Sequence, residues 1–246
     1  MVDRLINDIE GALMDLTSFI ATVPGAVANY AGIIYNVGQR YSIAPTQLAV
    51  MMWRESKAGT VLRPPGSAGT GDFTKRPAGR QYRQPSGAYY MVSASGMPED
   101  GAGWGRGLMQ IDYGVHNEWV TANDWTDPEV NIDKAAQLYY ESRQFFSQAA
   151  GAPITVDAWR LARGMPEYGI APWSTKYGLT SQGPYPDPRP LSGTLLEDAT
   201  LAAHNAGPSG VLQAIAAGLP PEAATTGQDY VSWTKRLLGG WLSGKH

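Results

Sequence analysis

The chain contains no cysteine and only three histidines, at positions 116, 204 and 246. Without cysteine it has no disulfide framework, no thiolate metal site and no cysteine nucleophile. The histidines are far apart and show no HExxH-type spacing. We therefore expect no metal centre and no cofactor.

The chain also lacks a large excess of one charge sign and long apolar runs. A formal net charge of −3 over 246 residues gives no basic excess, which argues against a nucleic-acid partner. No segment is long and apolar enough to span a membrane. The N-terminus has four acidic residues among its first 15 and lacks the basic start and unbroken apolar core of a secretory signal. We expect an intact product without a signal peptide, made in the cytosol.

Helical periodicity is what the chain does have. At the N-terminus, apolar residues recur at spacings of 3 and 4 until Pro24 and Gly25, which predicts a helix within residues 1–25. The apolar positions are Ile6, Ile9, Leu13, Leu16 and Ile20. This helix either packs on its own domain or docks to a partner.

Helical patterns continue along the rest of the chain, interrupted by two insertions rich in glycine and proline. Pro45 and Asp127 are typical of helix starts, and Gly207 is typical of a helix end. The first insertion contains the strand-like run "GAYYMVSAS". The sequence thus predicts an α+β, predominantly α-helical domain with a small inserted β region. The domain covers residues 26–246, and the insertions cover about 60–103 and 164–193.

The stretch "LAVMMWRES" places a carboxylate at the end of an apolar helix. Leu48, Met51, Met52 and Glu55 share one helical face, and their neighbours make the other faces apolar too. Burial disfavours an ionised carboxylate. Glu55 is therefore either a functional acid or a last-turn residue that reaches solvent or pairs with Arg54.

Four segments follow one another in the order "WRES", "GWGRGLMQID", "DPEVNIDKAAQLYY" and "AAHNAGPSGV". In this order they resemble the lysozyme-like superfamily of lytic transglycosylases and goose-type lysozymes. The goose-type branch is most similar, because "RESKAGTVL" is followed by "GTGD", "GLMQID" and "TTGQDY". The resemblance covers about residues 30–241, apart from the two insertions, and it implies a lysozyme-like fold.

The resemblance implies a peptidoglycan hydrolase, a muramidase that cleaves the β-1,4 bond between N-acetylmuramic acid and N-acetylglucosamine with inversion. Glu55 would be the general acid, which agrees with its apolar setting. An inverting enzyme also needs a carboxylate that places a water, roughly 6.5–9.5 Å from the acid. The end of "GLMQID" gives this role to Asp112. Its partner is Asp72 or Asp100, and we favour Asp72 because "GTGD" copies the family's Gly-x-Gly-Asp turn.

The resemblance also implies residues that contact the glycan strand or support the acid. These are Ser56, Gln110, His116, His204, Asn205 and Tyr230. His204 stands where relatives have a tyrosine, so this contact departs from the family pattern. Among the tryptophans, Trp104 lies in a glycine-rich loop and is the best candidate to stack on a sugar ring, whereas Trp53 and Trp233 fit the core.

Two other functions stay open. A lytic transglycosylase would use the muramic 6-hydroxyl as its nucleophile and leave 1,6-anhydro ends, and a non-catalytic glycan-binding module would keep the fold alone. Without a signal peptide, an enzyme for the extracytoplasmic cell wall would leave the cell by another route. Release through a holin, as for an endolysin, a phage-tail-like device and a dedicated secretion system all fit.

Overall fold

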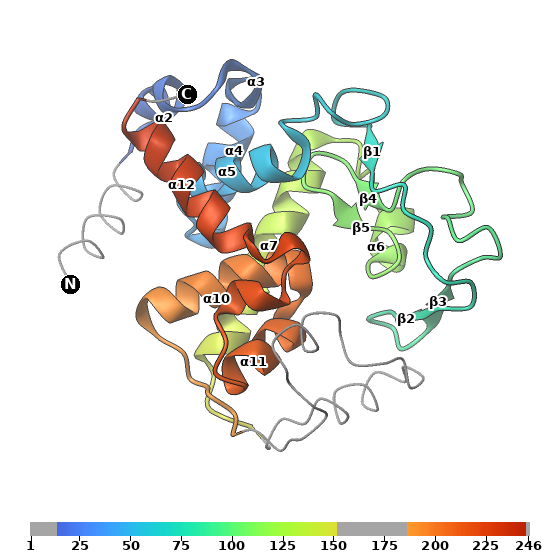
Figure 1. Cartoon of the computed structure of the whole chain (residues 1–246). Helices are drawn as coiled ribbons and strands as arrows, with labels where there is room; N and C mark the ends of the chain where they lie inside the picture. Colours follow the sequence, from blue (N-terminus) through green and yellow to red (C-terminus); the bar gives the residue numbers. More distant parts are fainter. Residues whose placement is uncertain (1–13, 152–185, 245–246) are drawn as a thin grey trace. The chain divides into compact units, whose positions relative to one another are not determined.

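The computed structural model describes residues 14–151 and 186–244 (Figure 1). The chain divides into two compact units, residues 1–137 with 237–246 and residues 138–236. The boundaries fall within two helices, α7 (Pro128–Ser147) and α12 (Tyr230–Leu242). Helices dominate and the strands are antiparallel, which confirms the predicted α+β, mostly helical class. Across the described residues, no helix combines the length and the apolar character required to cross a membrane.

The described part of the first unit begins with the short helices α2 (Leu16–Thr22) and α3 (Gly25–Ala28). Asp15 caps α2, because its backbone is extended and its Oδ1 accepts a 2.8 Å hydrogen bond from Ser18 N. The prediction of one helix through the whole apolar seam is therefore wrong, since the chain is not helical at Asp15.

Only the end of the apolar seam can be placed in the structure. Phe19 is fully buried, whereas Leu16 and Ile20 are 37% and 43% exposed. The other three seam positions, at 6, 9 and 13, lie outside the described residues. Residues 14–22 therefore bury Phe19, which the seam did not include, and expose the two seam residues.

Helices α4 (Ala31–Tyr41) and α5 (Pro45–Ser56) follow, and α5 starts at Pro45 as the sequence predicts. Ser42 ends α4 with a left-handed φ of 54°, and Pro45 occupies the first position of α5. Residues 48–52 are all fully buried. The helix that carries Glu55 is thus enclosed on nearly all sides over these residues, as its composition indicates.

A β-rich region follows α5, on the right of Figure 1. Strands β1 (Thr70–Gly71), β4 (Gly105–Arg106) and β5 (Ile111–Asp112) form an antiparallel sheet with β4 in the centre. Strands β2 (Gln81–Arg83) and β3 (Tyr89–Met91) form a separate hairpin. The predicted small β region is confirmed, and the strand-like run "GAYYMVSAS" contains β3.

The β-rich region has an aromatic core of its own. Tyr82, Val92 and Trp104 are buried together, and Tyr90 and Tyr113 pack against them. Tyr90 meets Trp104 and Tyr113 edge-on, at ring-centroid distances of 6.3 and 5.3 Å. Aromatic rings favour this geometry. The first insertion is therefore a packed element of the unit.

Helix α6 (Asn117–Ala122), the first half of α7 and the end of α12 also belong to the first unit. Asp127 caps α7 as predicted, because its Oδ1 accepts a 2.7 Å hydrogen bond from Glu129 N. The fully buried Asn131 then joins α7 to the turn between β4 and β5. Its Nδ2 donates to Arg106 O at 3.0 Å, and its Oδ1 accepts from Met109 N at 2.8 Å.

The second unit contains the end of α7, helices α10 (Gly193–Ala206) and α11 (Pro208–Ala216), two 3-10 turns and most of α12. The 3-10 turns are η1 (Pro221–Ala224) and η2 (Thr226–Gln228). Gly207, with a φ of 75°, ends α10 as predicted, and Pro208 starts α11. Residues 164–185 of the second predicted insertion lie outside the described residues.

Candidate active site

The three-stranded sheet brings two of the predicted catalytic aspartates to one end. Gly105 pairs with Gly71 on one side and with Asp112 on the other. Asp72 directly follows β1, and its carbonyl accepts a 2.9 Å hydrogen bond from Trp104 N. Asp72 and Asp112 are thus neighbours across strand β4, although they are far apart in sequence.

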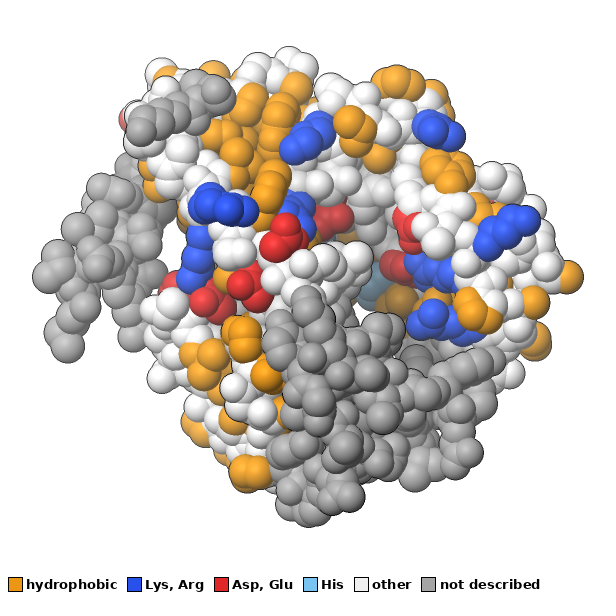
Figure 2. Space-filling view, in the orientation of Figure 1, with side chains coloured by type: hydrophobic (Ala, Val, Ile, Leu, Met, Phe, Trp, Pro, Cys, Tyr) orange, Lys and Arg blue, Asp and Glu red, His pale blue; other side chains and the backbone are white. Residues whose placement is uncertain are grey.

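A single arginine links these two carboxylates. Arg76 Nη2 donates to Asp112 Oδ2 at 2.5 Å and to Asp72 Oδ2 at 3.2 Å, and Nη1 donates to Asp112 Oδ1 at 3.0 Å. The Arg76 side chain is 14% exposed, against 45% for Asp72 and 33% for Asp112. Acidic and basic side chains gather on this part of the surface, on the right of Figure 2.

Aromatic groups hold the Arg76 guanidinium in place. Its central carbon lies 4.1 Å from the ring centre of Trp104, and Nη1 donates to the Tyr82 hydroxyl at 2.9 Å. Burial opposes the charge of Arg76, but the hydrogen bonds and the negative charge of Asp112 outweigh it, so the pKa of Arg76 is raised. Burial also raises the pKa of the neighbouring Tyr82 hydroxyl. Arg76 therefore remains a cation between the two aspartates.

The two aspartates present oxygens that lie near each other. The two Oδ2 atoms bond to the same nitrogen, so they lie no farther apart than the sum of the two distances given above. A water bridges two oxygens when they lie within about twice its hydrogen-bond length of about 2.7 Å. A carboxylate oxygen accepts about two hydrogen bonds, and each Oδ2 uses one of them on Arg76.

Gln110 lies in the turn before β5 and has a left-handed φ of 50°. Its Nε2 donates to Gly107 O at 2.7 Å, and its Oε1 lies against Gly71 and Gly105. A Cβ at these two glycines would come within 2.3 and 2.1 Å of that oxygen. Glycine is therefore required at both positions for Gln110 to lie across the sheet.

Ser56 anchors the end of α5 to the turn between β4 and β5. It is fully buried, and its Oγ donates to Leu108 O at 2.6 Å and accepts from Gly59 N at 3.0 Å. Glu55 lies next to this anchor in the last turn of α5 and is partly buried. One buried hydrogen bond thus joins the segment that carries Glu55 to the segment that carries Asp112.

Asp100, the alternative to Asp72, belongs to a different ion pair. Its Oδ1 accepts a hydrogen bond from Arg106 Nη2 at 3.0 Å, its Oδ2 forms an ion pair with Nη1 at 2.9 Å, and the Arg106 side chain is 1% exposed. Burial opposes the charge of Asp100, but the hydrogen bonds from Arg106 and from Ala102 N outweigh it, so its pKa is lowered. Of the two candidates, Asp72 is the one that shares an arginine with Asp112.

His116 lies directly before α6 and one helical turn after Asp112. Its backbone N donates to Asp112 O at 2.9 Å, and the residue is partly buried. The structure therefore brings His116 into the same local segment as Asp112.

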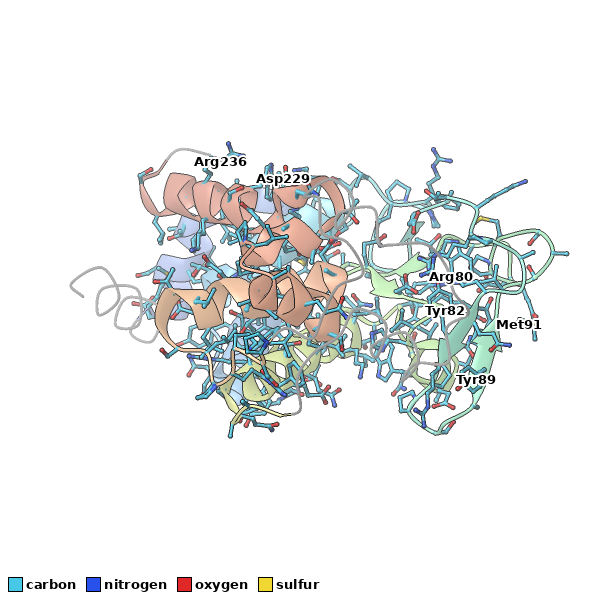
Figure 3. The ribbon with its side chains drawn as sticks, turned by 60° about the horizontal axis from the view of Figure 1, so that its bottom comes forward. Arg80, Tyr82, Tyr89, Met91, Asp229 and Arg236 are labelled. Atoms are coloured by element: carbon cyan, nitrogen blue, oxygen red, sulfur yellow. The ribbon has the colours of Figure 1, made fainter. Side chains whose placement is uncertain are left out.

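The prediction that Trp104 stacks on a sugar ring is wrong. Trp104 is fully buried in the aromatic core, and its Nε1 donates to Thr74 O at 3.0 Å. A buried ring offers no face to a ligand. The exposed aromatic residues of this region are Phe73, which is 42% exposed, and Tyr89, which is 48% exposed and lies near Met91 at the outer side of the hairpin in Figure 3. Trp53, expected in the core, is partly buried.

Three predicted site residues belong to the second unit. Asn205 Oδ1 accepts a 2.8 Å hydrogen bond from Thr226 N, which joins α10 to η2. The His204 ring centre lies 6.4 Å from that of Tyr230, with the planes tilted by 43°. Tyr230 is 1% exposed, so its predicted contact with a glycan is not supported. Trp233, the other tryptophan expected in the core, is partly buried.

Arg76 is the functional candidate that sequence reasoning missed. It lies four residues after Asp72 in an insertion rich in glycine, proline and serine, where it is one of four arginines and nothing in the sequence singles it out. The signal that could have found it is the position of an arginine one short loop after a predicted catalytic aspartate. Among the described residues, no group of three His, Asp or Glu side chains is placed to hold a metal ion.

Neither the comparison with protein-family models nor the comparison with curated protein sequences found a match to this chain.

Proposed function

We propose that this protein is a peptidoglycan hydrolase that cleaves the β-1,4 bond between N-acetylmuramic acid and N-acetylglucosamine with inversion, within a lysozyme-like fold. The observation that carries the proposal is the convergence of Asp72 and Asp112 on Arg76. An inverting glycosidase needs a carboxylate that activates a water opposite its acid, and Asp72 and Asp112 are two held carboxylates that could serve.

In the proposed reaction, Glu55 gives its proton to the glycosidic oxygen as the bond between that oxygen and C1 of the muramic residue breaks. The oxygen of a water held by Asp72 and Asp112 bonds to C1 from the opposite face. A proton of this water passes to the aspartate pair and then to solvent, and Glu55 takes up a new proton. The products are two shorter glycan chains, one with a new reducing end.

The support for Glu55 is its setting. It follows a fully buried run at residues 48–52, and its neighbour Ser56 is fixed to the turn before Asp112.

The proposal is tested with purified peptidoglycan and mass spectrometry of the released muropeptides. We expect reducing ends from the wild type, and a loss of at least about 10³-fold in rate for Glu55→Gln with an unchanged melting temperature. Glu141→Gln, on an exposed position of α7, is the matched control. Products with only 1,6-anhydro ends would make the protein a lytic transglycosylase, and binding to sacculi without any products would make it a glycan-binding module.

A further inference from the structure

We propose that Arg76 gives the two aspartates different roles in the reaction. It fixes Asp112 as the group that orients the attacking water and leaves Asp72 to accept the proton of that water. This inference rests on the proposed hydrolase activity and deepens it. Arg76 is a positioning residue in this scheme, because it acts through the two carboxylates.

Asp112 is the more fully bonded carboxylate. Its Oδ1 accepts from Arg76 Nη1 and from Val115 N, both at 3.0 Å, and its Oδ2 accepts from Arg76 Nη2 at 2.5 Å. A paired fork of this kind fixes the plane of a carboxylate as well as its position. The Oδ1 atom of Asp112 already has two donors, so the remaining acceptor position lies on Oδ2. This Oδ2 shares Arg76 Nη2 with Asp72.

Asp72 is held more loosely. Its Oδ2 has a single 3.2 Å contact with Arg76 Nη2, and its Oδ1 accepts from Thr74 N at 3.2 Å. Its side chain is 45% exposed. Asp72 can therefore take a proton on an oxygen with free acceptor capacity and pass it to solvent, while the fork between Arg76 and Asp112 stays intact.

Arg76 can do this because its surroundings leave it little freedom. Its guanidinium lies over Trp104, is bonded to the Tyr82 hydroxyl and is 14% exposed. A lysine would keep the charge, but its ammonium group cannot supply the planar fork to Asp112 together with a bond to Asp72. The geometry therefore predicts different results for the lysine and glutamine variants.

The role of Arg76 can be measured from which nucleophile, water or the 6-hydroxyl of the substrate, bonds to C1. Once the C1–O bond weakens, either a water or the 6-hydroxyl of the same muramic residue can bond to C1, and the second reaction leaves a 1,6-anhydro end. A correctly held water favours the first reaction. If Arg76 orients the aspartates, its loss displaces the water and raises the share of the internal reaction.

The experiment compares Arg76→Gln, Arg76→Lys and the wild-type full chain on purified peptidoglycan, with kcat, KM and the ratio of anhydro to reducing ends as readouts. Arg80→Gln is the matched control, because Arg80 is exposed and lies over the Tyr82 ring at 4.9 Å (Figure 3). We expect Arg76→Gln to lower kcat by about 10²-fold, to leave KM within about threefold and to raise the anhydro share. Arg76→Lys should give a kcat and an anhydro share between those of Arg76→Gln and the wild type. Arg80→Gln should match the wild type in all three readouts.

The outcomes separate this inference from the proposed function. A wild type that releases no reducing ends contradicts the hydrolase itself. A wild type that hydrolyses, together with an Arg76→Gln variant that keeps the wild-type rate, overturns the inference alone. A lower rate with an unchanged product ratio also overturns it, because it gives Arg76 a merely structural role. Circular dichroism checks folding, and if Arg76→Gln unfolds, Arg76→Lys decides on the same readouts.

Discussion

Replacement of Ser56 by alanine tests whether the end of the acid helix depends on one buried hydrogen bond. The change removes the donor to Leu108 O at 2.6 Å and the acceptor for Gly59 N at 3.0 Å. Gly59 N also donates to Ser56 O at 2.9 Å, so it keeps a partner after the change. The Leu108 carbonyl loses its hydroxyl donor inside the protein, which costs about 1–3 kcal/mol. We expect a destabilisation of about 2 kcal/mol.

Thermal unfolding checks this value. For a chain of this length, 1 kcal/mol corresponds to about 2–4 °C, so Ser56→Ala should melt roughly 4–8 °C below the wild type. Ser147→Ala, at an exposed end of α7 where the hydroxyl donates to Gln144 O, should change the free energy of unfolding by less than about 0.5 kcal/mol. A Ser56→Ala variant that melts together with this control would refute the reasoning.

Two further predictions concern ion pairs outside the proposed mechanism. Asp100→Ala removes the carboxylate that pairs with the buried Arg106. We expect it to lower the free energy of unfolding, measured by urea titration, by about 1–3 kcal/mol, a value already reduced because Asp100 is half exposed. An unchanged urea midpoint would contradict this expectation. The hydrogen bonds from Arg189 lower the pKa of Asp187 to about 2. Because the folded pKa of Asp187 lies below the unfolded value, this stabilisation is present above about pH 4 and is lost as the pH falls through about 2. Asp187→Asn should therefore weaken the pH dependence of the free energy of unfolding in this window by up to about 2 kcal/mol. A mutant curve parallel to that of the wild type would exclude this role.

The helix boundaries could be predicted from the sequence because their causes are local. Pro45 starts α5, Asp127 caps α7 and Gly207 ends α10, each through its own backbone geometry or a hydrogen bond to a residue two positions away. Such features need no knowledge of the tertiary structure. The same locality explains why Asp15 could interrupt the apolar seam, since a capping aspartate outweighs a weak periodicity.

Burial was harder to predict than helix boundaries. Trp104 lies between glycines and therefore indicated an exposed loop, yet it is fully buried. The reason is the pairing of β4 with β1 and β5 and the packing of Tyr90 and Tyr113, which come from distant parts of the sequence. Tyr230 is another case, because its position in a motif gave no measure of its 1% exposure.

The first insertion contributes more to the candidate site than its sequence indicates. In the sequence, residues 60–103 offer two candidate aspartates, Asp72 and Asp100, and one strand-like run, and they give no sign of a cation beside Asp112. In the structure, this segment supplies Asp72, Arg76 and Tyr82, and so provides the second carboxylate and the cation beside Asp112.

It follows that the insertion and the proposed site cannot vary independently. The hairpin β2–β3 contributes Tyr82 and Tyr90 to the core around Trp104, and Trp104 supports the guanidinium that joins the two aspartates. A shorter connection in place of the hairpin would remove this support, even if both aspartates were kept. The insertion thus supplies part of the packing that buries one face of Arg76, while the other contacts of Arg76 hold Asp72 and Asp112.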